Sequence, residues 1–211
     1  MRCGKLRAMR MAAVLAGACA TGAMMLTAAP ASAQFMGAGF KFLEAVKKKD
    51  GEEVEKTLGS TPTLINTRDV TTGETALHIV TARRDLTWLN FLVFKGANPN
   101  LRTDKGVSPL ALAVSLGWAD GAALLLERGA RVNDPDSTGE TPLIAAVHQR
   151  SLELVRLLIK GGADPLRADN SGRNARDYAE LMGKDSAVWE ALDTAAKAGA
   201  AKRKQSYGPS F

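Results

Sequence analysis

The sequence GETPLI at residues 139–144 decides how this chain folds, because close copies of it recur at one unbroken interval along the chain. GETALH occupies residues 73–78 and GVSPLA occupies residues 106–111. A degenerate copy, GRNARD, follows at residues 172–177. A fixed period of about 33 residues is typical of a chain built by stacking one small supersecondary unit. The period therefore predicts a solenoid, which presents a long continuous surface rather than a deep catalytic cleft.

Each copy has the residues that a tight turn and a following helix require. Polar residues precede each glycine, and the glycine itself supplies the positive φ of the turn. In the copy at 139–144, Thr141 suits a helix N-cap and Pro142 suits the first helical turn. A second helix then ends at Gly-Ala pairs that begin at Gly96, Gly129 and Gly162, again at the same interval. We expect a C-terminal glycine cap at each of these pairs.

This turn–helix–helix–loop unit resembles the ankyrin repeat, whose period matches this interval and whose signature is Thr-Pro-Leu-His-x-Ala. The resemblance covers residues 39–192, nearly all of the chain beyond its N-terminal segment. Single positions depart from the signature, since Ala76 replaces the proline and Ala111 and Ile144 replace the histidine. The resemblance implies an all-α fold, an α-solenoid of stacked ankyrin repeats with short hairpin-like turns and about five units including degenerate caps.

The domain boundaries follow from the period and from composition. We expect a signal peptide at 1–33, an ankyrin repeat domain at 34–192 and a flexible basic tail at 193–211. Within the domain the predicted units are a cap at 39–71, repeats at 72–104, 105–137 and 138–170, and a cap at 171–192. The last cap should cover the final apolar face with five larger side chains, which are Tyr178, Leu181, Val188, Trp189 and Leu192.

The N-terminal segment has the three parts of a secretory signal peptide. Four basic residues within positions 2–10 precede an uncharged run at 11–29, and the small-residue triplet Ala31-Ser32-Ala33 follows. We expect cleavage between Ala33 and Gln34 and export to a bacterial periplasm. Two alternatives are secretion and anchoring by an uncleaved segment. A lipid-anchored form beginning at Cys19 is weakly supported, because position 16 is Ala rather than the Leu that it requires.

Cleavage would change two global properties of the chain. Both cysteines, Cys3 and Cys19, would leave with the signal, so disulfide and thiolate chemistry would leave with them. The loss of four basic residues would lower the formal net charge from +6 to +2. A mature chain of that charge gives little support for nucleic-acid binding, so we expect no nucleic-acid partner.

The sequence contains no set of residues that predicts catalysis or a cofactor. It has no Gly-x-Ser-x-Gly nucleophile motif and no phosphate-binding loop. Residues 134–140 begin like a calcium-binding EF-hand loop, but position 12 of that loop would be Ala145 instead of a bidentate Glu. His78 occupies the position where the resemblance implies a hydrogen bond between neighbouring repeats, and His148 should face outward. We therefore expect no metal site and no enzyme.

The remaining signal concerns the surface formed by the turns and first helices, where the resemblance implies that protein partners bind. Leu112 and Leu116 either form an exposed apolar patch in the middle repeat or pack against neighbouring repeats. Phe94 and Trp118 are weaker contact candidates. The predicted partner-binding set comprises Ile79, Arg83, Asp104, Lys105, Leu112, Ser115, Leu116, Ser137, Thr138, His148 and Gln149.

These observations favour one function over two others. The preferred hypothesis is a monomeric interaction module that binds another protein of the cell envelope as a scaffold, chaperone or inhibitor. A membrane-associated structural protein could instead dock through its basic tail, which carries Lys197 and the triplet Lys202-Arg203-Lys204. An enzyme or ligand-binding protein on the same scaffold would need a convergent set of titratable groups. Fold alone does not choose among these functions.

Overall fold

The structure, a computed structural model, describes the backbone of residues 31–206 and the side chains of residues 37–199. Over that range it contains ten α-helices and one short 3-10 helix, η1. The expected signal peptide up to residue 30 and the end of the expected tail, residues 207–211, lie outside the described residues. The helices are α1 (Ala31–Lys48), α2 (Gly51–Ser60), η1 (Pro62–Asn66), α3 (Ala76–Ala82), α4 (Leu86–Phe94), α5 (Pro109–Ser115), α6 (Ala119–Glu127), α7 (Pro142–His148), α8 (Leu152–Lys160), α9 (Ala175–Leu181) and α10 (Ala187–Ser206).

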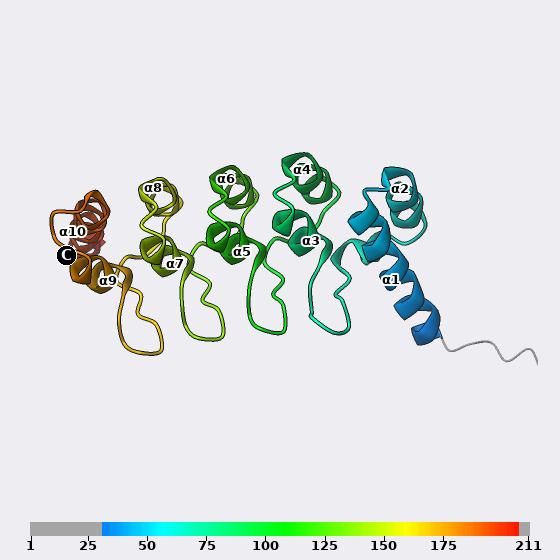
Figure 1. The fold of residues 1–211 in the computed structure, drawn as a ribbon, viewed down its shortest axis with the longest axis horizontal. Coiled ribbons are helices and arrows are strands. Elements are labelled where there is room, and N and C mark those ends of the chain that lie inside the picture. Colours follow the sequence, from blue (N-terminus) through cyan, green and yellow to red (C-terminus); the bar gives the residue numbers. More distant parts are fainter. Residues whose placement is uncertain (1–30, 207–211) are drawn as a thin grey trace, which may run out of the picture.

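The helices form five antiparallel pairs that stack side by side in a single row (Figure 1). The first helices of the repeats, α3, α5, α7 and α9, form one layer and are called here the inner helices. Their partners α4, α6, α8 and α10 form the outer layer. Four loops, here called fingers, project beyond the inner helices at residues 67–75, 95–108, 128–141 and 161–174. The predicted all-α solenoid of about five units is confirmed.

The turn and capping residues act as the repeat pattern predicts. The side chains of Ser108 and Thr141 accept hydrogen bonds from backbone N–H groups three residues on, and Pro109 and Pro142 occupy the first helical turn. The finger glycines all have positive φ, from 70° at Gly73 to 83° at Gly139 and Gly172. The Gly-Ala pairs that end the outer helices also contain positive-φ glycines.

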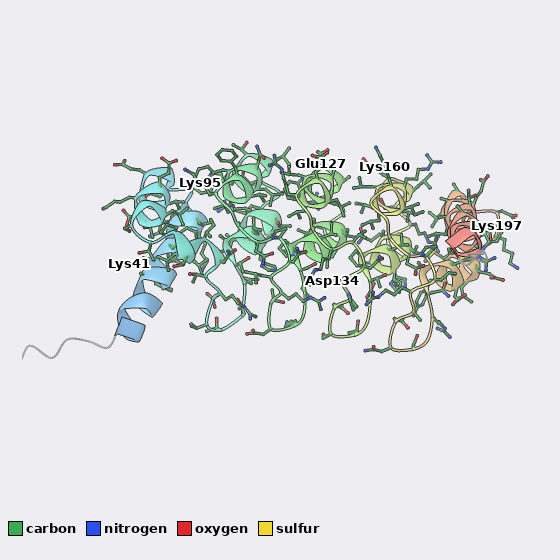
Figure 2. All side chains as sticks on the ribbon, turned by 180° about the vertical axis from the view of Figure 1, so that it is seen from behind. Lys41, Lys95, Glu127, Asp134, Lys160 and Lys197 are labelled. Atoms are coloured by element: carbon green, nitrogen blue, oxygen red, sulfur yellow. The ribbon has the colours of Figure 1, made fainter. Side chains whose placement is uncertain are left out.

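The core runs along the whole stack, between the inner and outer layers and between neighbouring units. Leucines at one register of the inner helices are fully buried, and so are leucines at one register of the outer helices, namely Leu77, Leu110, Leu143, Leu92, Leu125 and Leu158. Small residues on the inner helices, such as the fully buried Ala113 and Ala146, let the neighbouring helices approach closely. Charged residues such as Lys95, Glu127 and Lys160 occur along the outer layer (Figure 2).

The C-terminal cap differs from the expectation in two ways. Leu181 is 72% exposed and does not cover the last apolar face, whereas Val188 and Leu192 are buried there. The segment after Leu192 is also not a frayed tail from its first residue, because α10 continues to Ser206 and packs on α8 and α9. Asp193, expected to begin the tail, is 7% exposed and receives Arg176 at 2.8 Å and Lys197 at 2.6 Å. These ion pairs anchor the start of the segment.

No helix within the described residues is both long enough and apolar enough to cross a bilayer.

The finger glycines predict a measurable difference between inner and terminal fingers. Gly139 and Gly172 share a φ of 83°, but a β-carbon added at Gly139 would lie 2.6 Å from the backbone nitrogen of Asn170 in the next finger. A β-carbon at Gly172 would meet no atom within 4 Å. Both Gly→Ala changes should cost about 1–2 kcal/mol for the positive φ, and Gly139→Ala should cost about 1–3 kcal/mol more for the steric overlap.

Urea unfolding followed by circular dichroism measures both costs. Gly172→Ala is the matched control, since it has the same turn and the same φ with no following finger. Equal losses in the two variants would mean that close packing between fingers adds nothing to the stability of the stack.

Candidate functional site

The surface formed by the fingers and the inner helices, here called the inner face, contains two adjacent hollows. The first has a volume of about 290 Å³ and lies between the fingers that contain Glu74 and Asp104. The second, of about 350 Å³, lies between α5 and α7 and the fingers before them. Val107 and Leu112 line both hollows, so an apolar ridge separates them. Three successive repeats therefore build one continuous site.

The sequence left open whether Leu112 and Leu116 form an exposed patch or pack against neighbouring repeats, and the structure gives a different answer for each. Both side chains are half-buried, but Leu116 packs against the continuous core whereas Leu112 borders the two hollows. The difference follows from register, because Leu116 is the C-cap of α5 and lies over the turn to α6. Leu112 therefore borders the hollows while Leu116 contributes to packing, and partner binding by either residue stays a prediction. The proposed two-leucine patch therefore reduces to Leu112 and its neighbour Val107.

Arg83, Leu116 and Gln149 are each the C-cap residue of an inner helix. The side chains of Arg83 and Gln149 donate hydrogen bonds to the preceding unit of the stack. Arg83 donates from Nη1 to the carbonyl oxygens of Val46 at 2.7 Å and Lys47 at 3.0 Å, at the end of α1. Gln149 donates to the carbonyl oxygen of Val114 at 2.8 Å. These bonds satisfy carbonyls at helix ends, so the register mainly joins neighbouring repeats. Gln149 still lines the second hollow.

The other predicted residues lie on the fingers or along the inner helices. Ile79 packs against the core, and Ser115 donates to the carbonyl oxygen of Leu112 at 2.8 Å while lining the second hollow. Asp104 and Lys105 line the first hollow. Ser137 and Thr138 are exposed at the tip of the third finger and line neither hollow. Partner binding by these residues stays a prediction.

Hydrogen bonds between successive fingers hold the inner face in shape. Arg68 pairs with Asp104 of the next finger at 2.9 Å, and Arg102 pairs with Asp134 of the next at 2.8 Å. A second row is made by asparagine side chains, in which Asn100 and Asn133 each bridge to the start of the following finger. Sequence reasoning did not assign these roles, although the two asparagines occupy the same position of successive repeats, which was a usable signal.

The aspartates in the segment that resembles a calcium-binding loop make structural interactions with other residues of the protein. Asp134 pairs with Arg102, while one Asp136 oxygen accepts hydrogen bonds from the N–H and hydroxyl of Thr138 and from the N–H of Glu140. The same turn occurs at Asp169, where hydrogen bonds from Tyr178 and Ser171 hold the pKa of the carboxyl well below its usual range. Within the described residues, no three His, Cys, Asp or Glu side chains are grouped to hold a metal ion.

The two histidines have different environments. His78 is buried, and its Nδ1 accepts from the N–H of Thr75 at 3.1 Å. Because that nitrogen accepts, Nε2 carries the proton and donates to the carbonyl oxygen of Val107 in the next repeat at 3.0 Å. The expected hydrogen bond between repeats is confirmed. His148 is exposed as predicted, with Nδ1 3.1 Å from Glu140 and its ring edge-on to Tyr178.

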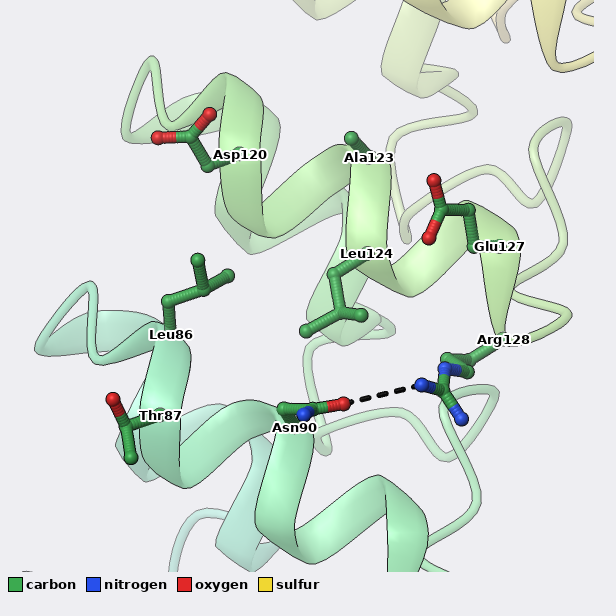
Figure 3. A pocket seen from close by; sticks show the side chains of 8 residues that line it. All are labelled: Leu86, Thr87, Asn90, Asp120, Ala123, Leu124, Glu127 and Arg128. Atoms are coloured by element: carbon green, nitrogen blue, oxygen red, sulfur yellow. Dashed lines mark hydrogen bonds between the residues drawn. The ribbon is translucent and has the colours of Figure 1, made fainter.

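A larger hollow lies between the outer helices α4 and α6 (Figure 3). Its volume is about 600 Å³, and a hydrogen bond of 3.2 Å from Arg128 to Asn90 crosses it. Leu86 and Leu124 form its apolar part, while Asp120 and Glu127 stand on its α6 wall. It is an open valley between two adjacent helices, whereas the hollows of the inner face draw on three repeats and share an apolar centre.

Two family models match the chain and agree with this architecture. A model of three ankyrin repeats matches residues 42–136, and a model of ankyrin repeats in many copies matches residues 125–179. Together they span the stack from α1 into α9. The chain belongs to the ankyrin repeat family, whose members generally act as protein-binding modules without enzymatic activity.

Proteins of diverse organisms share this similarity. The chain is 33% identical to the ANK repeat-containing protein nipk-1 of Caenorhabditis elegans, over 47% of this chain and 19% of the relative. It is 34% identical to the B-cell lymphoma 3 protein homolog of Mus musculus, over 53% and 26%. An ankyrin repeat-containing protein of Treponema pallidum is 38% identical, over 43% and 31%. The matched region thus spans less than a third of each relative.

The buried histidine predicts a dependence of stability on pH. Burial lowers the pKa of His78 below its usual value of 6.5. Well above pH 6.5 the histidine is neutral in both folded and unfolded chains. As the pH falls below 6.5, the unfolded chain takes up a proton that the folded chain resists, so the free energy of unfolding should decrease, by at most about 1.4 kcal/mol per pH unit from this residue.

Chemical unfolding of the wild type and of His78→Gln between pH 8 and pH 5 tests this. The variant should be less stable at every pH because the geometry of the buried bonds changes, and it should also lose part of the pH slope. An unchanged slope in His78→Gln would rule out His78 as its source.

Proposed function

We propose that this chain is a non-enzymatic protein-binding module of a bacterial cell envelope, acting as a scaffold, chaperone or inhibitor. It binds a partner through the inner face. One observation supports this most strongly, which is that three repeats form two adjoining hollows with Leu112 and Val107 between them. Family membership supports the same class of function, because ankyrin repeats generally bind proteins.

The chemistry of the inner face suits protein binding. An apolar centre with a polar rim is the arrangement in which a few contacts contribute most of the binding energy. Here Leu112 and Val107 form the centre, while Glu74, Lys105 and His148 belong to the rim. The fingers are already fixed by their mutual hydrogen bonds, such as the bond between Arg68 and Asp104. A surface ordered in this way loses little conformational entropy when a partner binds.

We propose in addition that the chain is exported to the periplasm and that residues 1–33 are removed there. The support is the order of basic, uncharged and small-residue segments in positions 2–33. Helix α1 begins at Ala31, so the proposed cleavage lies in its first turn. A mature chain beginning at Gln34 keeps every residue of α1 that is buried in the core, from Phe42 to Val46.

The binding proposal predicts that partner capture depends on Leu112. The chain would carry a C-terminal tag, be expressed with its own N-terminal segment and be recovered from the envelope fraction of its host, where its mass should correspond to a start at Gln34. Leu112→Asp should abolish capture of partners that the wild type retains, because a charge replaces the apolar centre. Its circular dichroism should stay helical, because Leu112 lies outside the buried core.

Phe94→Asp is the matched control for this experiment. Phe94, a weaker contact candidate from the sequence, is 79% exposed at the end of the outer helix α4 and lines neither hollow of the inner face, so the substitution places the same charge on an exposed apolar residue away from that face. Proteins captured by the wild type and by Phe94→Asp but not by Leu112→Asp would support the proposal. Capture that survives Leu112→Asp, or is lost only with Phe94→Asp, would contradict binding through the inner face.

A further inference from the structure

The inner face carries a charge pattern that bears on the chemistry of its partner. The residue after each finger glycine occupies one register, and along the stack these residues are Glu74, Val107, Glu140 and Arg173. The first three border the two hollows. Val107 therefore lies in the same row as two glutamates, with one glutamate on the repeat before it and one on the repeat after it. Leu112 adds a second apolar group at the centre of this row.

Among the other residues that border the hollows, carboxylates outnumber lysine and arginine side chains by two to one. Asp104 lines the first hollow and Asp136 lines the second, and Lys105 is the one lysine or arginine side chain among the lining residues. Asp104 is paired with Arg68, and Asp136 accepts three hydrogen bonds within its own finger. These two carboxylates are therefore largely occupied. Glu74 and Glu140 remain as the lining carboxylates able to pair with a basic partner, and Lys105 stands beside Asp104 at the first hollow.

The local contacts of the two glutamates support this role. Within the described side chains, no lysine, arginine or histidine nitrogen lies within 4.0 Å of the Glu74 carboxylate. Glu140 contacts only the exposed ring of His148 in that way. Both side chains are half-buried at the edge of a hollow, where water screens a charge less than it does on an open surface. A cation brought by a partner would meet no existing ion pair at Glu74, whose charge interacts at longer range with Lys47, and at Glu140 it would compete with the exposed ring of His148.

We propose that the inner face binds a partner segment in which an apolar side chain is flanked on both sides by lysine or arginine. This inference rests on the proposed function and specifies its partner. The apolar side chain contacts Leu112 and Val107, and the two basic side chains pair with Glu74 and Glu140. An acidic protein segment would instead place carboxylate against carboxylate, which costs affinity. The pattern thus selects one class of partner.

The spacing of the repeats limits the spacing of the partner's residues. Packed helices lie about 8–10 Å apart, so two repeats separate Glu74 and Glu140 by roughly 20 Å. An extended segment advances about 3.3 Å per residue, which places each basic residue about three positions from the apolar one. The expected segment is therefore basic-x-x-apolar-x-x-basic, running along the row of fingers.

A random library of 12-residue peptides displayed on phage, selected against the purified mature chain, tests this inference. Peptides that also bind Leu112→Asp are discarded, which leaves those that use the centre of the inner face. We expect the remaining peptides to carry Lys or Arg on both sides of Leu, Ile, Met or Phe. Their affinity, measured by fluorescence anisotropy, should fall about tenfold or more in the double variant Glu74→Lys/Glu140→Lys, because two ion pairs become repulsions. The effect should shrink between 0.1 M and 1 M salt.

The double variant Glu127→Lys/Glu153→Lys is the matched control, because both residues are exposed on the outer helices α6 and α8. It makes the same change in net charge and should leave the affinity of the selected peptides unchanged. Peptides that depend on Leu112 but show no basic flanks, or bind both double variants equally, would overturn this inference while leaving the proposed binding face intact. If no peptide depends on Leu112, the inference and the proposed function both fail.

Discussion

The whole structure depends on the burial of each helix pair's apolar side against the next pair. No single repeat encloses its own leucines, since Leu110 on α5 and Leu125 on α6 become fully buried only within a stack in which α3 and α7 flank α5, and α4 and α8 flank α6. Complete burial of one such side chain contributes about 1.5–3 kcal/mol. Stability in this arrangement comes from nearest-neighbour contacts, so each repeat must match the next in length and register. The constant interval between the finger glycines reflects this equal length and register of the repeats.

The same constraint shapes the polar connections between repeats. The fingers are loops, and loops leave many backbone groups without partners inside their own unit. Here the next finger supplies them, as when Asp104 donates its N–H to the carbonyl oxygen of Thr72 at 3.1 Å. His78 serves the same purpose between an inner helix and the following finger. The inner face is therefore held rigid by the repeats themselves, and its remaining side chains can be used for recognition.

The sequence period made the architecture predictable. Most of the features that could not be predicted depend on the direction in which a side chain points. Helix starts and finger glycines followed from local chemistry at positions such as Ser108 and Gly139. The direction of Arg83 could not be predicted, because only the packed stack brings the carbonyl ends of α1 within its reach. Leu181 and the continuation of α10 lie beyond the last full repeat, where the period no longer constrains the chain. Of the predicted apolar patch, Leu112 lies at the centre of the site and Leu116 packs against the core.

The turn within each repeat shows how one conformation can be hidden from sequence reasoning. Arg84 and Arg150 adopt φ values of 54° and 56° at the register where Gly117 and Gly183 also have positive φ. A glycine at this register would have indicated a positive φ, but an arginine does not, so the sequences at Arg84 and Arg150 gave no sign of it. At both positions the arginine N–H donates to a carbonyl oxygen of the inner helix just before it, Arg84 to Thr81 at 2.9 Å and Arg150 to Val147 at 2.8 Å, so the closed turn fixes the conformation.

Equilibrium unfolding of chains containing one or several repeats tests the central claim most directly. Residues 105–137 alone should give the circular dichroism of an unfolded chain, because their leucines have no neighbouring unit to cover them. Residues 34–206 should unfold cooperatively, and residues 72–170 should have a smaller but measurable stability. A helical spectrum and a cooperative transition for residues 105–137 alone would contradict the claim that burial between repeats creates the fold.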